Sequence, residues 1–294
     1  MHRNKQFRDF LLSDNLVFLM EAHDALSAKI AQVSGFQALW ASGLTISASL
    51  GLRDCSEISV TETLNVVESM ADVTTIPIML DGDTGYGNFN NVRLLVKKLI
   101  KRGISAVCLE DKIFPKKNSF IKDMQPLEDV DTFCGKIKAG KDSQTDDNFS
   151  IVARTEALIA GHSISEALDR SYAYINAGAD AILIHSRQTT ADEILSFLKQ
   201  WKNYATVVLV STKYYKTPTN VFEQEKVSMI IWANHSLRAA IIAMQNICRK
   251  ILKDRSVENV EEEIASLDEI FQLVEQDELS QAEKKYLTKR RKND

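Results

Sequence analysis

Acidic side chains follow two of the short apolar segments of this 294-residue sequence. Asp81 and Asp83 come after one such segment, Glu110 comes after another, and Asp54 lies in a polar stretch upstream. Each carboxylate alone is compatible with a solvated loop or a helix N-cap. Together, and without a cysteine or histidine cluster, they favour Mg²⁺, which prefers oxygen ligands and keeps part of its water shell. We therefore expect a Mg²⁺ site in which some of these acids bind the ion through water.

Two side chains that can bind an anion also follow apolar segments. Arg154 comes after residues 150–153, and His185 comes after residues 180–184. A guanidinium offers a planar pair of donors to a phosphate or carboxylate, and an imidazole can donate a hydrogen bond. Taken singly, the arginine is equally compatible with a structural ion pair and the histidine with a satisfied position at the edge of the core. Beside a metal ion, both side chains can bind an anionic substrate.

A polar loop follows Glu110 and contains Lys116 and Asn118. A loop of this composition at the end of a strand can close over an anion, although a solvated turn is the simpler interpretation of this segment alone. Because polar residues recur after other apolar segments, we expect residues 112–125 to act as a lid.

Segments of strand length alternate with helical patterns along the whole chain. The expected strands are residues 16–20, 36–40, 76–80, 106–109, 150–153, 180–184, 206–210 and 227–231. Repeated β–α units argue for a parallel sheet of the α/β class, and about eight of them predict a (β/α)₈ TIM-type barrel. An open doubly wound sheet is the main alternative, but no Gly-x-Gly-x-x-Gly follows the first strand. In a barrel, the carboxyl ends of the strands would bring the polar residues to one mouth.

The chain has the length of one large domain. We expect residues 1–294 to form a single (β/α)₈ barrel domain, with residues 240–294 as a C-terminal helical extension that packs on the barrel or on a partner. The small residues of the stretch 45–54 would let backbone amides approach a ligand closely, and a packed loop is the simpler interpretation. The basic run 289–292 could be a nucleic-acid or targeting patch, but a solvated tail is favoured at the end of the chain.

Composition excludes several classes of function. A formal net charge of −4 argues against a nucleic-acid-binding protein. No apolar run approaches the length of about 18 residues that a membrane span needs. The four cysteines are scattered without paired spacing, which indicates free thiols in a reducing cytoplasm. We therefore expect a cytoplasmic protein with a small-molecule substrate and neither a nucleic-acid nor a membrane partner.

Six motifs resemble those of the phosphoenolpyruvate phosphomutases, within the isocitrate lyase and phosphoenolpyruvate mutase superfamily. They are residues 40–44, 51–54, 81–87, 110–119, 151–154 and 184–186, and the resemblance covers nearly the full length. The motif at 81–87 is shared across the superfamily. The loop at 110–119 is more specific, because the lyases carry a catalytic cysteine in a Lys-Lys-Cys-Gly loop that this chain lacks. Cleavage of isocitrate-like substrates is therefore not expected.

The resemblance implies an isomerase that moves a phosphoryl group between the enolate oxygen and the methylene carbon of pyruvate. It thus implies interconversion of phosphoenolpyruvate and phosphonopyruvate. By this match Asp81 binds Mg²⁺ most directly, while its waters are held by Asp83, Glu110 and Asp54. By this match, the backbone amides of Ser42, Gly43 and Leu44 bind the pyruvyl oxygens. Trp40 packs beside the substrate. By the same match, Arg154, His185 and Asn118 bind the phosphoryl group. The loop that contains Lys116 acts as the lid. The implied catalytic residues are Asp54, Lys116, Asn118, Arg154 and His185.

The resemblance also bears on assembly and on competing functions. In this family the last barrel helix is exchanged between subunits, and a homotetramer results as a dimer of helix-swapped dimers. A phosphonopyruvate hydrolase, which would release pyruvate and phosphate, is the main alternative function. A non-catalytic, oligomeric barrel scaffold is a more remote one, and it predicts that the acidic residues bind no Mg²⁺.

Overall fold

The computed structural model describes residues 3–119 and 126–287. The chain divides into two compact units, Met1–Leu237 and Arg238–Asp294. The first unit contains the barrel and every residue of the predicted site, so it is the part that bears on function. The end of the predicted lid at 120–125 and the basic run at 289–292 lie outside the described residues.

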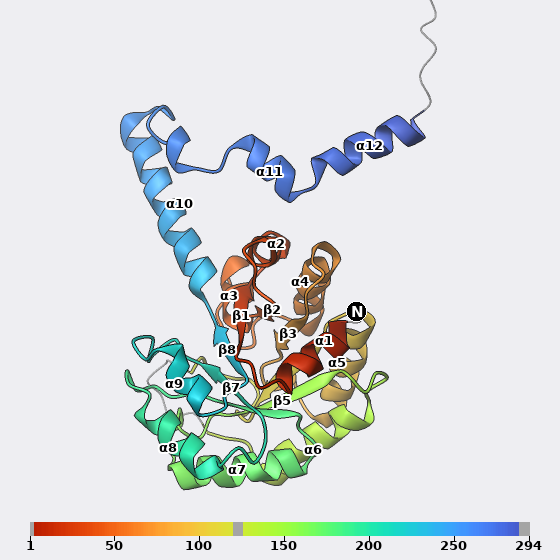
Figure 1. Cartoon of the computed structure of the whole chain (residues 1–294), viewed down its shortest axis with the longest axis vertical. Helices are drawn as coiled ribbons and strands as arrows, with labels where there is room; N and C mark the ends of the chain where they lie inside the picture. Colours follow the sequence, from red (N-terminus) through yellow and green to blue (C-terminus); the bar gives the residue numbers. More distant parts are fainter. Residues whose placement is uncertain (1–2, 120–125, 288–294) are drawn as a thin grey trace, which may run out of the picture. The chain divides into compact units, whose positions relative to one another are not determined.

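Eight parallel strands close into a barrel in sequence order (Figure 1), and β8 pairs with β1. This confirms the predicted TIM-type fold and excludes the open sheet. Each predicted strand is present, with ends that differ by a few residues: β1 (Val17–Ala22), β2 (Ala38–Ala41), β3 (Ile78–Asp81), β4 (Ala106–Glu110), β5 (Ser150–Thr155), β6 (Ala181–Ile184), β7 (Val207–Val210) and β8 (Met229–Trp232).

Helices connect the strands on the outside of the barrel. They are α2 (Ala25–Val33), α3 (Gly43–Ser49), α4 (Val60–Val73), α5 (Phe89–Lys101), α6 (Val130–Asp142), α7 (Ile164–Asn176), α8 (Asp192–Trp201) and α9 (Thr219–Gln224). Local sequence explains where several begin. Asp24 and Ser59 each cap the first turn of the following helix in a capping box, which satisfies amide groups that would otherwise lack a partner.

The prediction of a packed loop at 45–54 was wrong over its first half, where α3 lies. The Ser42 hydroxyl accepts a hydrogen bond from the Thr45 amide at the start of this helix. Small residues and a serine cap are compatible with a short helix as well as with a loop, and the contacts that decide between them are with distant strands. The consequence is that Gly43 and Leu44 occupy a first helical turn at the end of β2.

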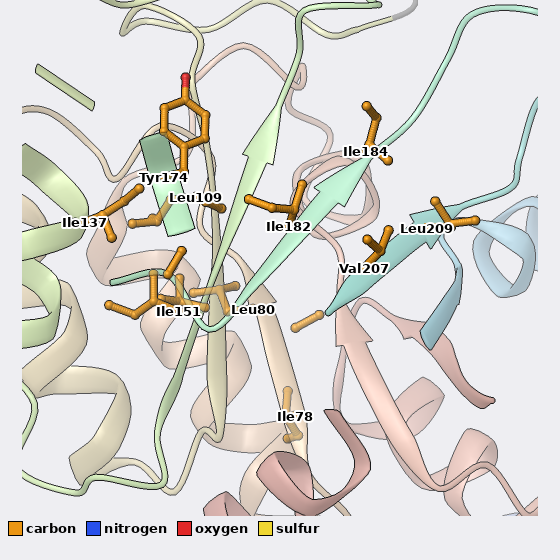
Figure 2. Close-up of a cluster of buried hydrophobic side chains, with 14 of the residues drawn as sticks. Ile78, Leu80, Leu109, Ile137, Ile151, Tyr174, Ile182, Ile184, Val207 and Leu209 are labelled. Atoms are coloured by element: carbon orange, nitrogen blue, oxygen red, sulfur yellow. The ribbon is translucent and has the colours of Figure 1, made fainter. Parts of the chain in front are cut away.

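Successive side chains of each strand point alternately into the barrel and toward the helices, which gives two apolar cores. Side chains such as Leu19, Met79 and Val152 fill the barrel interior, and the neighbouring positions face the helices. Figure 2 shows this outer core, in which strand residues such as Leu80 and Ile182 lie with Tyr174 of α7. Continuing the inward alternation past each strand end places polar residues over the interior core.

The helix α1 (Arg3–Leu11) lies before the first strand and packs against the interior core. Its buried side chains Phe7 and Leu11 belong to the same apolar cluster as Val17 and Leu19 of β1. They contribute to the apolar filling of the barrel from a segment that precedes its strands.

The C-terminal helices are α10 (His235–Asp254), α11 (Leu267–Leu273) and α12 (Gln276–Tyr286), with a short 3₁₀ turn at Glu261–Glu263. None of the three helices has a buried residue, and large apolar side chains on them are exposed, among them Ile242, Leu252, Leu267 and Phe271. Within the described residues, no helix is both long and apolar enough to cross a membrane.

Candidate active site

A pocket lies at the carboxyl ends of the strands and contains most of the predicted site residues. The predicted residues that line it come from several strand ends and from the first part of the lid. The lining residues are Trp40, Ser42, Leu44, Asp54, Asp81, Lys116, Asn118, Ser119, Arg154, His185, Val210, Thr212, Ala233 and Asn234. The inward alternation explains this set, because positions such as Trp40, Asp81 and Arg154 continue the interior side of their strands.

Three predicted residues lie beside the pocket rather than in its lining. The Gly43 amide donates a hydrogen bond of 3.3 Å to Asp81 Oδ2. Asp83 is paired with Lys116, and Glu110 Oε2 lies 3.5 Å from Arg154 Nε. Glu110 and Arg154 are partners in the β4–β5 register, which places an acid beside a base at the mouth. The structure thus brings every predicted site residue into one region.

The pocket also contains residues that the sequence did not single out. Ser119, Thr212 and Asn234 add polar groups, and Val210 and Ala233 add apolar surface. Thr212 follows Val210 by two positions, so the alternation of β7 would have indicated it. The Thr212 hydroxyl is buried and has no hydrogen-bond partner among the described residues.

Lys116 lies between two of the predicted metal-site carboxylates. Its Nζ is 2.8 Å from Asp54 Oδ1 and 2.6 Å from Asp83 Oδ1. Asn118 adds a hydrogen bond of 2.6 Å from Nδ2 to Asp54 Oδ2. All of these side chains are largely buried, so the ammonium offsets a charge that water cannot reach. The first part of the lid is therefore attached to the acidic side of the pocket.

Burial and like charge change the ionisation of these acids. Burial raises the pKa of Asp83 to about 7, with Asp81 and Asp54 acting in the same direction and Lys116 against it. Burial also works to raise the pKa of Asp54, but Lys116 and Asn118 leave it below its ordinary value. The pKa of Asp81 is raised by burial. Closely spaced acids with raised pKa values are typical of a site that awaits a cation.

The carboxylate side of the pocket fits a hydrated Mg²⁺ ion. Its donors are all oxygens, and the buried Glu110 Oε1 accepts no hydrogen bond from the described residues. A Cβ atom at Gly43 would lie 3.0 Å from Asp83 Oδ1 and 3.3 Å from Asp81 Oδ2, so glycine lets the chain approach these acids closely. In the described ranges, no three His, Cys, Asp or Glu side chains are close enough to hold one ion together.

Glycine is also required inside the Asp81–Asp83 motif. A Cβ atom at Gly82 would lie 2.5 Å from Val107 Cγ2 and 3.1 Å from the Cys108 carbonyl oxygen. Any larger residue would push β3 away from β4, because a strand backbone and a β-branched side chain cannot both shift cheaply. The glycine therefore keeps both aspartates next to Glu110 on the adjoining strand.

Arg154 and His185 form the cationic side of the pocket. Arg154 Nη2 lies 2.9 Å from His185 Nε2 and donates to Ser119 Oγ at 3.0 Å. Burial works to lower the pKa of Arg154, but Glu156 and Glu110 raise it well above its ordinary value. Burial lowers the pKa of His185, so the imidazole is mainly neutral at pH 7. The site offers a fixed positive charge and a neutral donor or acceptor side by side.

A buried polar network supports this cationic side from the outside of the barrel. Asp111 Oδ1 accepts the Glu156 amide at 2.8 Å, and Asp111 Oδ2 accepts the Tyr174 hydroxyl at 2.6 Å. Burial raises the pKa of Asp111 to about 6. Thr155 also turns to this side, since its hydroxyl donates to Asp111 at 3.3 Å and it is absent from the pocket lining. The residue after Arg154 therefore supports the strand rather than shaping the pocket.

A closed (β/α)₈ barrel with carboxylates facing an arginine and a histidine, and a lysine–asparagine loop beside them, defines an enzyme of the isocitrate lyase and phosphoenolpyruvate mutase superfamily. The sequence model described as phosphoenolpyruvate phosphomutase matches residues 7–252. The chain belongs to the phosphoenolpyruvate phosphomutase family, whose members are isomerases.

Similar proteins agree with this assignment. The chain is 52% identical over 286 residues to a phosphoenolpyruvate phosphomutase of Tetrahymena pyriformis, covering 97% of this chain and 95% of that protein. It resembles a crystal structure of the phosphomutase from Streptomyces platensis subsp. rosaceus with a TM-score of 0.96 and 42% identity, covering 98% and 100% of the two chains. It also resembles a phosphonopyruvate hydrolase solved with oxalate and Mg²⁺, with a TM-score of 0.93, 39% identity and coverage of 98% and 100%. The mutase relatives are the more similar in sequence.

Proposed function

We propose that the chain interconverts phosphoenolpyruvate and phosphonopyruvate, as an intramolecular phosphotransferase of phosphonate biosynthesis. The observation that carries the proposal is the division of one pocket into an acidic side and a cationic side. Asp81 on the acidic side lines the same pocket as Arg154 and His185 on the cationic side. A substrate with a carboxylate and a phosphoryl group needs both sides, because its anionic oxygens require a cation at each end.

The proposed cofactor is Mg²⁺, held most directly by Asp81 and through water by Asp83, Glu110 and Asp54. When bound, the ion would neutralise the negative charge of the pyruvyl oxygens and of the surrounding acids. The related hydrolase that was solved with oxalate and Mg²⁺ supports this assignment, since oxalate has the shape and charge of a pyruvate enolate.

Backbone amides at the start of α3 are proposed to bind the pyruvyl oxygens. The amides of Ser42 and Gly43 donate long bonds of 3.3 Å to the Ala22 carbonyl and to Asp81, and a substrate oxygen would compete with weak acceptors of this kind. Leu44 lies in the same turn and lines the pocket. Trp40 adds a flat apolar surface beside them, on which the carbon skeleton of pyruvate can pack.

Phosphoryl transfer in this pocket would be loose and dissociative. The phosphorus–oxygen bond of phosphoenolpyruvate breaks, the phosphoryl group crosses to the methylene carbon of pyruvate enolate, and a phosphorus–carbon bond forms. Arg154 stabilises the charge of the transferring group, and His185 and Asn118 orient it. No group of the protein needs to gain or lose a proton, so orientation and charge are the main requirements.

Water must be excluded while the enolate exists, because protonation would give pyruvate and hydrolysis would give phosphate. Lys116 and Asn118 attach the first part of the lid to Asp54, and Ser119 attaches it to Arg154. These contacts would hold the lid across the pocket during transfer. The distinction between a mutase and a hydrolase therefore depends on how well this segment excludes water.

The test is phosphorus NMR of the purified protein with phosphonopyruvate and Mg²⁺, beside a sample that contains a chelator. A phosphoenolpyruvate signal that requires the metal supports the mutase. Inorganic phosphate without phosphoenolpyruvate would replace this proposal with the hydrolase. An unchanged phosphonopyruvate signal would refute both activities.

We also propose a homotetramer built as a dimer of helix-swapped dimers. The exposed apolar side chains of α10, α11 and α12 support it, since such surface is usually covered by a partner. Size-exclusion chromatography with light scattering would show a particle of four chains, and a monomer would refute the assembly. A cytoplasmic location is proposed because all four cysteines carry free thiols.

A further inference from the structure

Glu156 has no role in the reaction described above, although its carboxylate contacts both the cationic side of the site and the first part of the lid. It follows Arg154 by two positions at the end of β5, and its side chain is completely buried. It is not among the residues that line the pocket. We propose that Glu156 is a positioning residue that orients Arg154 and His185 and connects them to the lid. This inference rests on the proposed function for its catalytic consequence.

The two oxygens of Glu156 have separate partners. Oε1 accepts Arg154 Nε at 2.5 Å and lies 2.7 Å from His185 Nε2. Oε2 accepts the Ser119 hydroxyl at 2.8 Å and lies 3.0 Å from Lys112 Nζ. One oxygen thus holds the two phosphoryl-binding side chains, and the other holds the lid segment. A single carboxylate couples the geometry of one group to that of the other.

Lys112 strengthens the connection to the lid. Its Nζ donates to the Lys117 carbonyl at 2.9 Å and to Ser119 Oγ at 2.6 Å, in addition to its contact with Glu156. The buried ammonium of Lys112 therefore connects the beginning of the segment 112–119 to its end. Displacement of this segment would remove partners from Glu156 Oε2 and leave charge unbalanced in a buried region.

Glu156 also determines which nitrogen of His185 carries a proton. His185 Nε2 lies 2.7 Å from Glu156 Oε1 and 2.9 Å from Arg154 Nη2. A carboxylate can only accept a hydrogen bond and a guanidinium can only donate one, so the two contacts require opposite states of Nε2. The contact with the carboxylate is shorter, and Arg154 Nη2 already donates to Ser119. Nε2 therefore carries the proton and donates it to Glu156.

The carboxylate is itself held in place by the polar network outside the barrel. The Glu156 amide donates to Asp111, and Asp111 is fixed in turn by Tyr174 and by Arg170 Nη1 at 3.3 Å. A side chain whose backbone is fixed in this way can orient its partners within the narrow tolerance that catalysis needs.

The test is the substitution Glu156→Gln, which keeps the size of the side chain but removes its charge and one acceptor. We expect kcat to fall about 100-fold, as for a misplaced reacting group, with a smaller change in KM. The control is Glu128→Gln, because Glu128 is also paired with a lysine, but that lysine is Lys136 and belongs to neither the pocket nor the lid. Wild-type kcat in folded Glu156→Gln would overturn the proposal.

A second readout does not depend on activity. In protein labelled with ¹⁵N-histidine, the wild type should show His185 protonated at Nε2, and Glu156→Gln should shift the proton toward Nδ1 or mix the two forms. An unchanged His185 spectrum would overturn the proposal even if the protein lacks mutase activity. Absence of activity in the wild type would instead refute the proposed function.

The glutamine variant leaves two buried cations, Arg154 and Lys112, with fewer acceptors, so a second variant is needed if it fails to fold. Glu156→Asp keeps the charge and shortens the side chain by one methylene. We expect a folded protein whose kcat is lowered about 10-fold or more because its oxygens no longer reach both groups. Wild-type kcat in this variant would overturn the proposal as well.

Discussion

Replacing Lys116 with methionine removes a buried cation from between two carboxylates. The Nζ atom lies 2.8 Å from Asp54 and 2.6 Å from Asp83, and the lysine side chain is only 5% exposed. Breaking a buried ion pair by removing one partner typically costs about 3–5 kcal/mol, because the remaining charge is left uncompensated. This is a large part of a total stability of roughly 5–15 kcal/mol.

The loss should depend on pH. In the wild type the pKa of Asp83 is about 7, and Lys116 lowers it. Without Lys116 that pKa rises further, so Asp83 binds a proton near pH 6 and the uncompensated charge disappears. A carboxyl group whose folded-state pKa is raised costs stability as pH rises through that value. The destabilisation by Lys116→Met should therefore be larger at pH 8 than at pH 6.

Urea unfolding in the presence of a chelator measures the effect without Mg²⁺. With a slope of roughly 3 kcal/mol per molar, a loss of 3 kcal/mol lowers the midpoint by about 1 M. The matched control is Lys117→Met, because the adjacent Lys117 is exposed. Equal midpoints for the two variants at pH 8 would refute the reasoning, as would a larger loss at pH 6 than at pH 8.

Three further predictions concern the metal and the phosphoryl group. Asp81→Ala should abolish activity and lower Mg²⁺ affinity at least about 10-fold by calorimetry, since it removes the proposed direct ligand; unchanged affinity would place the ion elsewhere. Asn118→Ala should reduce kcat about 100-fold and lower the unfolding midpoint less than Lys116→Met does, because positioning is lost while one hydrogen bond to Asp54 and little packing are removed; a midpoint shift with normal kcat would contradict its role. Burial lowers the pKa of His185, so NMR titration should show it below 6.5. The contribution of neutral His185 to stability is then complete at pH values above its pKa in the unfolded state. It is lost as pH falls through its pKa in the folded state, and a titration above 6.5 would refute this.

The fold could be predicted because the strands are short apolar segments that end in polar residues. In β4 and β5 the change from apolar to charged occurs at Glu110 and Arg154, which are register partners in the barrel. The apolar segment thus predicts the strand, and the first charged residue after it marks the end of the strand that faces the site. The helix α3 could not be predicted with the same certainty, because small residues suit a loop as well as a short helix.

The candidate site was predictable where a residue carries its own signal. Asp81 and Arg154 are charged residues at strand ends, and charge at such a position is unusual enough to notice. Glu156 has the same kind of position, two residues after Arg154, but its importance comes from partners as distant in sequence as Ser119 and His185. Spacing within one strand cannot reveal contacts of this kind, so a residue that acts through others needs the structure.

The packing of α1 against the interior core has a consequence for how substrate and product reach the pocket. Phe7 and Leu11 belong to the apolar filling below the pocket, so the reaction chamber is blind at its base. Substrate and product then have to use the open side of the pocket, beside Lys116 and Asn118. A product molecule therefore has to leave through this opening before the next substrate molecule can enter. The amino-terminal helix, far in sequence from Lys116 and Asn118, thereby helps to keep the far end of the barrel interior closed.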